Sequence, residues 1–489
     1  MTSRDLVRVG MGTASLWGSW KTPHPLLDGI DVTAVFTEDR SGSKAVVAVG
    51  DVCGMWTSTC TRLRRLIARH VGAPTDAVGV FCTQNHGAPP EGPGVYDADL
   101  WSAAFLDAVD AARSAALPAV AAYVEVRPDP PGIFNRRKRT DDAGSFTFWY
   151  GFESLPGGKA GCARLLDAAV RGLYAGPEVA VRCTLPDDSD RLWPWPASVP
   201  PRSLDAVLDG PVDPLVQGLF FRAADGRPIG AIARWSAHPV TANAPGGHSG
   251  DYPYYVRRRL SRELGGTALF LTGPCGDQAP MVVEKSRALA ESTGERIAGL
   301  LLEGLGQAQW KEPAVARAAT RTVRLPLRED MPRTAEQAAR DLQDARAVLA
   351  RLRADTAPLG EVKRASERIE RLRYLVDGDL SGWCGMSFAE LSAATVRHPL
   401  FALRIGDVIL AGLPGEPFHS FSLELRRRMP DQRLLVCEEA NGYLSYVPPA
   451  AEYAQGGYGA SAAILAPAAE EMLLSNVEAL VRSMGGGGA

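Results

Sequence analysis

Short apolar runs alternate with helix-like segments along the first half of the chain, and this pattern constrains the fold most. The runs at 45–52 (AVVAVGDV), 78–84 (VGVFCTQ) and 119–126 (AVAAYVEV) have the length and composition of buried strands. Alanine-rich stretches at 98–116 and 164–175 are typical of helices. The alternation therefore predicts an α/β fold, with layered mixed sheets and flanking helices.

Apolar runs continue in the rest of the chain. LVQGLFFRA, PIGAIARWSA and GTALFLTG form a second set of predicted strands, and FALRIGDVILAGLPGE and RLLVCEEANGYLSYVPP form a third. The segment 184–214, which contains LWPWPASVPPRS, is rich in proline. We expect it to be a long, irregular surface loop.

Residues 333–376 differ from this pattern, because apolar residues recur there at spacings of three and four among many Arg and Glu. The repeat predicts an amphipathic helical hairpin packed on the surface of the domain. A partner-binding coiled coil is the alternative, but each arm covers few heptads. We expect one domain over 1–483 with this hairpin as an insertion, and a disordered tail at 484–489. The repeating positions are Leu342, Ala345, Leu349 and Leu352 in one arm, and Val362, Ala365, Ile369, Leu372 and Val376 in the other.

Composition excludes several classes of protein. A net charge of -3 offers no basic footprint for nucleic acid. No apolar stretch approaches the roughly 20 residues of a transmembrane helix, and the start MTSRDLVRVGMG lacks the apolar region of a secretory signal. The eight cysteines are scattered without a CxxC pair, which favours free thiols in a reducing compartment. We therefore expect a cytoplasmic protein; nothing in the sequence fixes its oligomeric state.

Four predicted strands end in polar residues, where rigid scaffolds often hold functional groups. The stretches are FCTQNHGAPP, IARWSAHPVTAN, ILAGLPGEPF and ANGYLSYVPPAAEYAQGGYGAS. They carry His86, His238, Glu416 and Tyr446, a nitrogen and oxygen ligand set that suits zinc. Each has an ordinary alternative, because a histidine after a strand is often structural and Pro-Gly-Glu can be only a turn.

The order of these and other motifs resembles a known family. GIFNRRKR is similar to an Asn-Arg motif, HSGDYPYY to a Ser-(Ser/Gly)-Asp turn, LTGPCGDQAP to Gly-Asp-x-x-Pro, and AGLPGEPF to Pro-Gly-Glu. Near the end, Asn441, Tyr443 and Tyr446 keep an Asn-x-Tyr-x-x-Tyr spacing, followed by Tyr453 and Tyr458. Together they resemble the neutral/alkaline, non-lysosomal ceramidases, which are zinc-dependent amidases. The resemblance covers nearly the whole chain and implies a ceramidase-like catalytic domain.

The resemblance places the family's metal ligands on His238, Glu416 and Tyr446. The fourth ligand of the family is the first histidine of a His-Thr-His run, and here that position is Gln84. The second histidine of the run corresponds to His86. Because residues i and i+2 share a face of a strand, we expect Gln84 and His86 to face the same site.

Three arrangements can replace the missing imidazole. Gln84 can bind through its amide oxygen, His86 can move in as a ligand, or His248 can supply a nitrogen. If none applies, the chain is a catalytically inactive, ceramidase-like binding or scaffold protein. The presence of the other ligands and of the Asn-Arg motif favours a working zinc site.

The resemblance also assigns catalytic roles. Arg136 and Tyr458 are the candidates to stabilise the oxyanion of a cleaved amide, and His86 is the candidate acid/base group. Arg136 lies in an NRRKR run that can also be a solvated basic face, and Tyr458 can be a core residue. Second-shell or substrate-binding roles are expected for Gln84, His248, Asp251, Asp277 and Tyr453.

The expected activity is hydrolysis, or formation, of a linear N-acyl amide bond in a small molecule. The family's secreted members carry a signal peptide and an added C-terminal β-sandwich domain, whereas this chain ends about 30 residues after Tyr458. We therefore expect a soluble metabolite as substrate rather than membrane ceramide. A serine hydrolase is disfavoured, because no GxSxG motif occurs.

Overall fold

The structure is a computed structural model, and most of the 489 residues are described. The described ranges are 6–91, 95–140, 144–147, 180–184, 190–194, 204–207, 210–242, 246–280, 285–376, 386–391 and 393–485. The predicted helix at 164–175 lies outside them.

A mixed eight-stranded sheet forms the larger half of the molecule. Its strand order is β14-β13-β12-β5-β1-β2-β3-β4, with parallel pairing between β3 and β4 and between β13 and β14. The runs that were predicted from their apolar composition form β3, β4, β5, β12, β13 and β14, whereas β1 and β2 were not predicted from composition. The bounds are β1 Arg8–Ser15, β2 Asp31–Glu38, β3 Lys44–Gly50, β4 Val78–Cys82, β5 Leu117–Val126, β12 Val216–Ala223, β13 Pro228–Trp235 and β14 Thr267–Thr272.

A four-stranded sheet packs face to face on the first. It contains β16 (Ala316–Pro326), β17 (Thr395–Ile405), β18 (Val408–Gly412) and β20 (Arg433–Cys437), and β18 pairs with β20 in parallel. A continuous apolar core joins the sheets, in which residues such as Phe81 and Ile232 of the first meet Phe401 and Leu410 of the second. This core is the inner layer of a sandwich.

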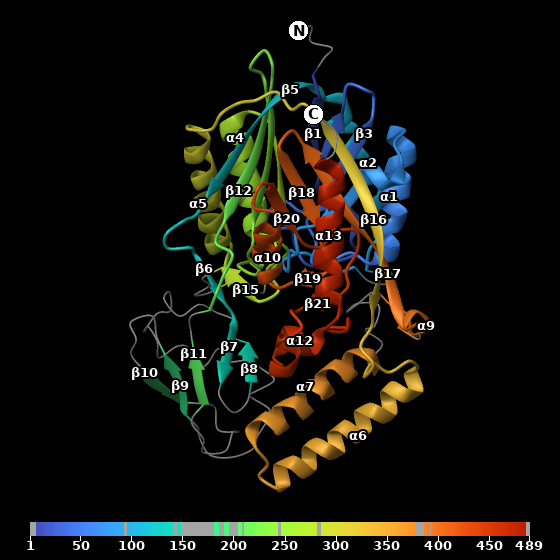
Figure 1. Ribbon diagram of the computed structural model, residues 1–489, viewed down its shortest axis with the longest axis vertical. Helices are drawn as coiled ribbons and strands as arrows, with labels where there is room; N and C mark the ends of the chain where they lie inside the picture. The colour runs from blue at the N-terminus through green and yellow to red at the C-terminus, as the bar shows by residue number, and fades with distance from the viewer. Residues whose placement is uncertain are drawn as a thin grey trace.

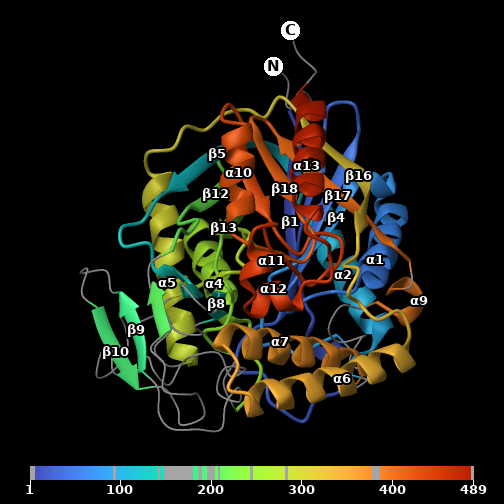
Figure 2. The same ribbon diagram turned by 60° about the horizontal axis from the view of Figure 1, so that its bottom comes forward.

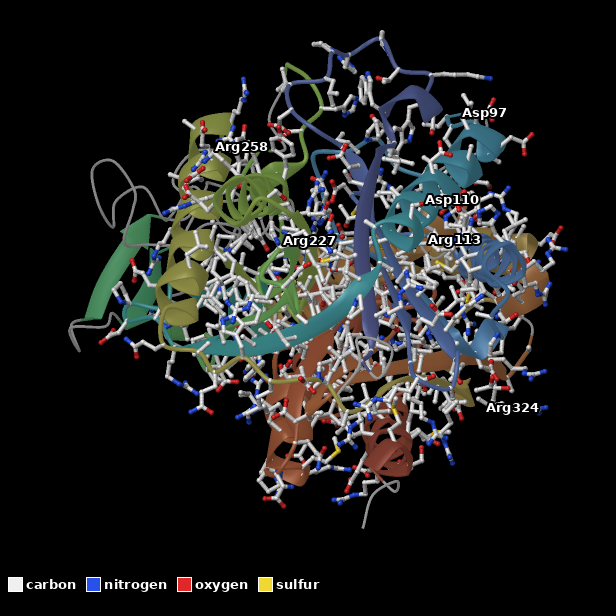
Figure 3. The ribbon with its side chains drawn as sticks, turned by 90° about the horizontal axis from the view of Figure 1, so that it is seen from above. Asp97, Asp110, Arg113, Arg227, Arg258 and Arg324 are labelled. Atoms are coloured by element: carbon white, nitrogen blue, oxygen red, sulfur yellow. The ribbon has the colours of Figure 1, made fainter. Side chains whose placement is uncertain are left out.

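Helices cover both outer faces. The larger sheet is covered by α1 (Thr57–Val71), α2 (Ala98–Ser114), α4 (Asp251–Leu264) and α5 (Arg287–Leu305). α1 and α2 share one apolar core against the strands, and α4 and α5 share another. The smaller sheet is covered by α10 (Ser420–Arg428) and α13 (Ala469–Gly485). Figures 1 and 3 show the resulting layers of helix, sheet, sheet and helix. The predicted α/β fold class, with layered mixed sheets and flanking helices, is confirmed.

Short elements gather at one end of the sandwich. Two two-stranded pairs lie there, β6 with β15 and β19 with β21, close to the one-turn helices α11 and α12 (Figures 1 and 2). Their bounds are β6 Ile133–Asn135, β15 Gln278–Pro280, β19 Glu416–Pro417, β21 Tyr446–Val447, α11 Glu452–Gln455 and α12 Tyr458–Ala462. A further pair consists of β7 (Arg137–Thr140) and β8 (Gly144–Thr147), and the remaining short helices are η2 (Trp17–Ser19), η3 (Thr75–Ala77) and α9 (Phe388–Leu391).

Two contacting helices, α6 (Ala335–Ala354) and α7 (Leu359–Val376), occupy the segment predicted as a helical hairpin. They cross the same end of the sandwich as the short elements (Figure 2). Besides apolar residues, α7 buries an ion pair between Lys363 and Glu367, and Glu367 Oε1 accepts a hydrogen bond of 2.8 Å from the main-chain N–H of Gly457. The hairpin therefore supports the turn that precedes α12.

Two expectations from the sequence are corrected. The proline-rich segment 184–214 is not wholly irregular, because β10 (Asp190–Pro194) and β11 (Leu204–Val207) pair there with β9 (Ala180–Thr184). Residues 484 and 485, which were expected in a disordered tail, belong to α13, which continues to Gly485 and buries Met484 against the smaller sheet. Residues 486–489 lie outside the described part.

Two further observations concern the described residues. None of their helices is both long and apolar enough to span a bilayer. The described cysteines, Cys53, Cys60, Cys82, Cys275 and Cys437, carry free thiols, as expected.

The packing of α2 on β1 depends on two glycines. A Cβ atom on Gly10 would lie 2.0 Å from the carbonyl oxygen of Ala112, and one on Gly12 would lie 2.4 Å from that of Ala108. These are backbone atoms, so a side chain can be admitted only if the helix moves away from the sheet.

We predict that Gly12→Ala lowers the free energy of unfolding by about 1–3 kcal/mol, because the added methyl forces α2 off the sheet. Chemical denaturation followed by circular dichroism measures the change. Gly18→Ala is the matched control, because nothing lies within 4 Å of a Cβ atom at that position. Equal stability of the two variants would contradict this account of the interface.

Candidate active site

Three predicted ligands come together from both sheets. His238 follows the end of β13 in the larger sheet, whereas Glu416 and Tyr446 follow β18 and β20 of the smaller sheet. Glu416 and Tyr446 are register partners in the parallel pair β19–β21, which places their side chains side by side. All three residues are buried, with exposed fractions of 0%, 2% and 3%.

The polar atoms of these residues converge on one point. Glu416 Oε2 lies 3.1 Å from His238 Nε2, and the Tyr446 hydroxyl oxygen lies 3.4 Å from the same nitrogen. The rings of His238 and Tyr446 are nearly parallel, with an interplanar angle of 10°. Glu416 Oε1 accepts a hydrogen bond of 2.8 Å from the hydroxyl of Tyr443, a residue that was not predicted to belong to the site.

Hydrogen bonding determines which nitrogen of His238 faces this point. Nδ1 lies 2.8 Å from the main-chain oxygen of Cys275, which can only accept, so Nδ1 carries the proton. Nε2 then presents its lone pair to Glu416 and Tyr446. A contact of the second ring nitrogen with a carbonyl is the usual support of a metal-binding histidine.

The protonation states also suit a cation. Burial, followed by the charge of Arg136, lowers the pKa of His238, so its imidazole is neutral. Burial alone would raise the pKa of Glu416; its interactions with His238, in the form protonated at Nε2, and then with the hydroxyl of Tyr446 lower it. Among the described residues, Glu416 Oε2 has no hydrogen-bond partner. A neutral imidazole and an ionised carboxylate whose lone pairs face each other in a buried site form a donor set that fits a metal ion.

Arg136 lies against the same atoms. One guanidinium nitrogen, Nη2, donates to the oxygen of Gly276 at 2.8 Å and to the hydroxyl of Tyr446 at 3.0 Å, and it lies 3.2 Å from Nε2 of His238. The residue joins β6 to β7 and is only 3% exposed. The alternative that NRRKR forms a solvated basic face is therefore wrong for Arg136 and for Arg137, which is also buried.

The expectation that Gln84 and His86 share a strand face is wrong. β4 ends at Cys82, and Gln84 has a left-handed backbone conformation with φ of 62°, so strand alternation stops before it. The Oε1 atom of Gln84 lies 3.1 Å from the thiol of Cys275 and can accept its hydrogen bond. This thiol lies on the Nδ1 side of His238. Gln84 therefore supports the site from behind and does not face the convergence point.

His86 lies beside the cluster. Its ring stacks on that of His238 at a centroid distance of 5.5 Å, and Cys53 Sγ lies 3.7 Å from its Nε2. Burial lowers the pKa of His86 to about 3. The imidazole is therefore neutral at physiological pH and a weak base in this buried position.

Two predicted residues are not part of the cluster. The ring nitrogens of His248 lie 3.1 Å from the oxygen of Gly87 and 3.2 Å from the hydroxyl of Thr22, so this histidine is held elsewhere. The hydroxyl of Tyr453 donates to the oxygen of Leu465 at 2.7 Å, which is a structural contact. His248 is thus not in position to replace the missing imidazole.

Three others border the cluster. The ring of Tyr458 packs edge-on against Tyr446 at 5.3 Å. Asp251, at the start of α4, accepts hydrogen bonds from the hydroxyl of Thr241 and, at 2.6 Å, from the main-chain N–H of Ala242, which holds the loop that follows His238. The main-chain oxygen of Asp277 accepts a bond of 2.8 Å from the N–H of Arg136, so this residue positions the arginine.

Sequence analysis missed Tyr443, Cys275 and Glu438 as functional residues. Tyr443 and Cys275 lie within motifs that were recognised, so their place in those motifs was an available signal. Glu438 follows a predicted strand, RLLVC, as a charged pair with Glu439, and both side chains are buried. Two adjacent glutamates in sequence normally indicate a solvated turn, so only the structure reveals this residue.

Metal-binding side chains are sparse in the described part of the chain. It contains no group of three or more His, Cys, Asp or Glu residues able to hold a metal ion. The convergent set has two such residues, His238 and Glu416, and takes its third donor from the phenol of Tyr446.

Comparisons with known proteins bear on the fold. No protein-family model and no curated protein matches the sequence. Two solved structures match over 98% of the chain with a TM-score of 0.62: a ceramidase complexed with C2, at 16% identity and 76% of its length, and the neutral ceramidase from Pseudomonas aeruginosa, at 17% identity and 74% of its length. The chain has the fold of neutral ceramidases. The resemblance inferred from the motifs is confirmed at the level of this ceramidase fold.

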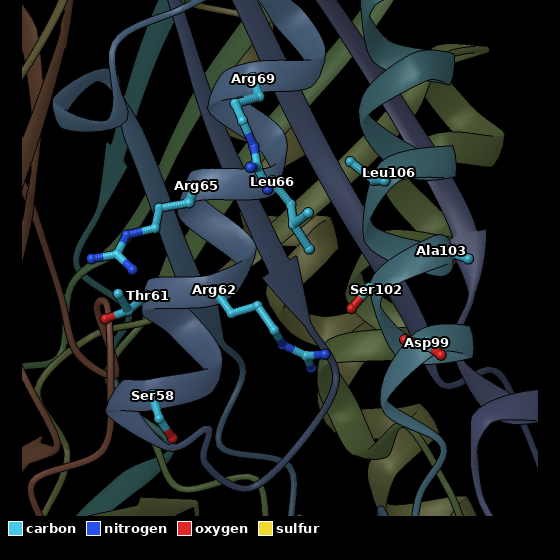
Figure 4. Close-up of a pocket in the computed structure, with 10 residues that line it drawn as sticks. All are labelled: Ser58, Thr61, Arg62, Arg65, Leu66, Arg69, Asp99, Ser102, Ala103 and Leu106. Carbon is cyan, nitrogen blue, oxygen red and sulfur yellow. The ribbon is translucent and has the colours of Figure 1, made fainter.

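A surface groove lies apart from the cluster, between α1 and α2, and has a volume of about 710 Å³. Arg62, Arg65 and Arg69 line it, but Arg65 points away from α2 while Arg62 reaches toward it (Figure 4). None of the predicted site residues lines this groove. It is therefore a surface feature separate from the cluster.

A buried ion pair supports Asp277 and hence Arg136. Asp277 Oδ2 lies 2.6 Å from Nδ1 of His419, and Asp277 Oδ1 accepts a hydrogen bond of 2.8 Å from the main-chain N–H of His419. Burial alone would lower the pKa of His419, but Asp277 raises it. Burial alone would raise the pKa of Asp277, but His419 lowers it.

The pair should therefore stabilise the fold in a limited pH range. The contribution of His419 is full below its unfolded pKa of about 6.5 and is lost as pH rises through its folded value. That of Asp277 is full above its unfolded pKa of about 3.9 and is lost as pH falls through its lowered value. The stabilisation is thus greatest between about pH 4 and 6.5.

We predict that His419→Gln lowers the free energy of unfolding by about 1–3 kcal/mol at pH 6, and by less at pH 9. Denaturant titrations at both pH values measure the difference. His70→Gln is the control, because His70 pairs with Asp110 on the surface, where ion pairs contribute little. A loss for His419→Gln that is equal at both pH values would show that the pair is not charged.

Proposed function

We propose that this protein is a metal-dependent amidohydrolase of the ceramidase type, which cleaves or forms the amide bond of an N-acyl amine. The observation that carries the proposal is the convergence of His238 Nε2, Glu416 Oε2 and Tyr446 Oη beside the buried cation of Arg136. The ceramidase fold supports it, because strand ends of both sheets meet at this point.

His238, Glu416 and Tyr446 would hold the metal ion, with zinc as the expected metal. Three protein ligands are typical of catalytic zinc sites, which keep a position open. A bound zinc would activate water and polarise the carbonyl of the amide. We leave Gln84 and His248 out of the ligand set, because both side chains are engaged elsewhere. His86, which stacks on His238, stays the candidate for a fourth ligand.

The chain's own residues would perform the remaining tasks. Arg136 is a permanent cation whose guanidinium is fixed by Gly276 and Tyr446, so it is preorganised to stabilise a developing oxyanion. Tyr458, which packs on Tyr446, would assist it. His86, whose ring stacks on His238, is the candidate to carry a proton between water and the departing amine.

We predict that the purified protein holds about one zinc ion per chain. His238→Ala and Glu416→Ala should each lower zinc affinity on the order of a hundredfold or more, because each removes one of three protein donors. Chelator competition measures the affinity, and His70→Ala, on the surface, is the control that should keep it. Full zinc content in both ligand variants would refute the ligand assignment.

The same measurement separates the proposal from its alternative. A catalytically inactive, ceramidase-like binding or scaffold protein is the alternative, since Gln84 replaces a histidine of the family's ligand set. That protein would bind no zinc in the wild type and would cleave no N-acyl amine. A cytoplasmic location and a soluble metabolite as substrate remain predictions. A screen that compares cleavage of soluble N-acyl amines with cleavage of ceramide in vesicles tests the prediction about the substrate.

We further predict that Arg136→Ala lowers kcat for an N-acyl amine by roughly 10²-fold or more, because the guanidinium stabilises the oxyanion. Steady-state kinetics on zinc-loaded protein measures the loss. Arg222→Ala is the matched control, since Arg222 lies over the ring of Trp310, outside the site. An unchanged kcat for Arg136→Ala would restrict Arg136 to a structural role.

A further inference from the structure

A buried carboxyl group lies on the Nδ1 side of His238, opposite the convergence point. It belongs to Glu438, which directly follows β20 and has an exposed fraction of 0%. Burial raises the pKa of this carboxyl well above its usual range. A polar group in such a position costs free energy unless hydrogen bonds compensate for its lost solvation.

The hydrogen bonds of Glu438 converge on a single residue. Its Oε2 accepts the main-chain N–H of Cys275 at 2.9 Å, and its Oε1 lies 3.0 Å from the thiol of the same residue. Two contacts from one carboxyl group to the main chain and the side chain of one residue restrict both its position and its rotation. Glu438 therefore fixes Cys275 within the loop between β14 and β15.

Cys275 in turn determines the orientation of His238. The main-chain oxygen of Cys275 lies 2.8 Å from Nδ1 of His238, so the proton of the imidazole is held on Nδ1. A displacement of this oxygen would free the imidazole to rotate or to move its proton to Nε2. In either case Nε2 would no longer present a lone pair to Glu416 and Tyr446.

Gln84 belongs to the same assembly. Its Oε1 lies 3.1 Å from the thiol of Cys275, so one sulfur atom contacts both Gln84 and Glu438. The thiol has one proton and can donate it to either oxygen. Gln84 thus helps to hold Cys275, the residue that supports the imidazole of His238 on its Nδ1 side.

We propose that Glu438 is a positioning residue for His238: by holding the main chain of Cys275, it fixes the carbonyl that keeps the imidazole in its Nδ1–H form, with Nε2 directed at Glu416 and Tyr446. The consequence for metal affinity rests on the proposed function. The prediction about the tautomer of His238 is independent of that function, because protein groups alone set the tautomer.

The chain offers a matched control in the next residue. Glu439 is also buried, with an exposed fraction of 1%, and burial also raises its pKa. Its carboxyl contacts the thiol of Cys82 at 3.4 Å, and among the described residues it forms no hydrogen bond with Cys275 or His238. Removal of Glu439 should therefore perturb the same region of the core without changing the tautomer of His238.

The test uses the full chain labelled with ¹⁵N-histidine, freed of metal with a chelator and observed by NMR. The His238→Gln spectrum identifies the signals of His238 among the seven histidines. We expect the Nδ1–H form in the wild type, in Glu438→Gln, which keeps an oxygen acceptor for the N–H of Cys275, and in Glu439→Leu. Glu438→Leu should show a mixture of forms, and so should Glu438→Asp, whose shorter side chain withdraws the acceptor.

Zinc affinity, measured by chelator competition, provides the second readout. We expect a loss of about 10–100-fold for Glu438→Leu, as for other residues that orient a metal-binding histidine, and little change for Glu438→Gln and Glu439→Leu. If Glu438→Leu does not fold, the comparison of Glu438→Asp with Glu438→Gln decides.

Two results would overturn the inference: an unchanged His238 tautomer in folded Glu438→Leu or Glu438→Asp, or an equal change of tautomer in Glu439→Leu. A tautomer that responds as expected in a protein that binds no zinc in any form would uphold the positioning role and refute the metal-dependent function. The two proposals therefore fail separately.

Discussion

The parallel pairing of two very short strands, β19 and β21, sets the geometry on which the candidate site depends. Glu416 and Tyr446 are partners in this pair because each lies just beyond a longer strand, β18 or β20, and these two strands are themselves parallel neighbours. Parallel strands bring their carboxyl ends to the same edge of a sheet. His238 reaches this edge from β13 of the other sheet, so the cluster exists only when both sheets are packed together.

Burial gives this cluster its chemical character. In a medium of low dielectric constant, an ionised carboxylate and a guanidinium interact strongly, but each must be satisfied by nearby groups. The cation of Arg136 is held by Gly276 and Tyr446, and its main chain by Asp277, which is itself bound by His419. The polar groups are thus fixed before any ligand arrives, which is the condition for electrostatic stabilisation of a transition state.

Much of the fold was accessible from the sequence. Apolar runs identified most strands of the larger sheet, because a strand buried on both faces must be apolar throughout, but they did not identify β1 and β2. Spacings of three and four identified the segment that forms α6 and α7, but they gave no sign that Lys363 and Glu367 are buried beneath the turn that carries Tyr458. Local periodicity reports which face of a helix is apolar, whereas the burial of an ion pair depends on a segment about 90 residues away.

Motifs determined the identities of His238, Glu416 and Tyr446 as a set, because each follows a strand end and their order along the chain is recognisable. The sequence could not determine where Gln84, His86 and His248 point. Strand alternation placed Gln84 and His86 on one face, but the left-handed conformation at Gln84 ends the strand geometry. Tertiary structure alone directs Gln84 to Cys275 and ties His248 to Gly87, because side-chain direction is decided by backbone torsions and by partners brought in from distant parts of the chain.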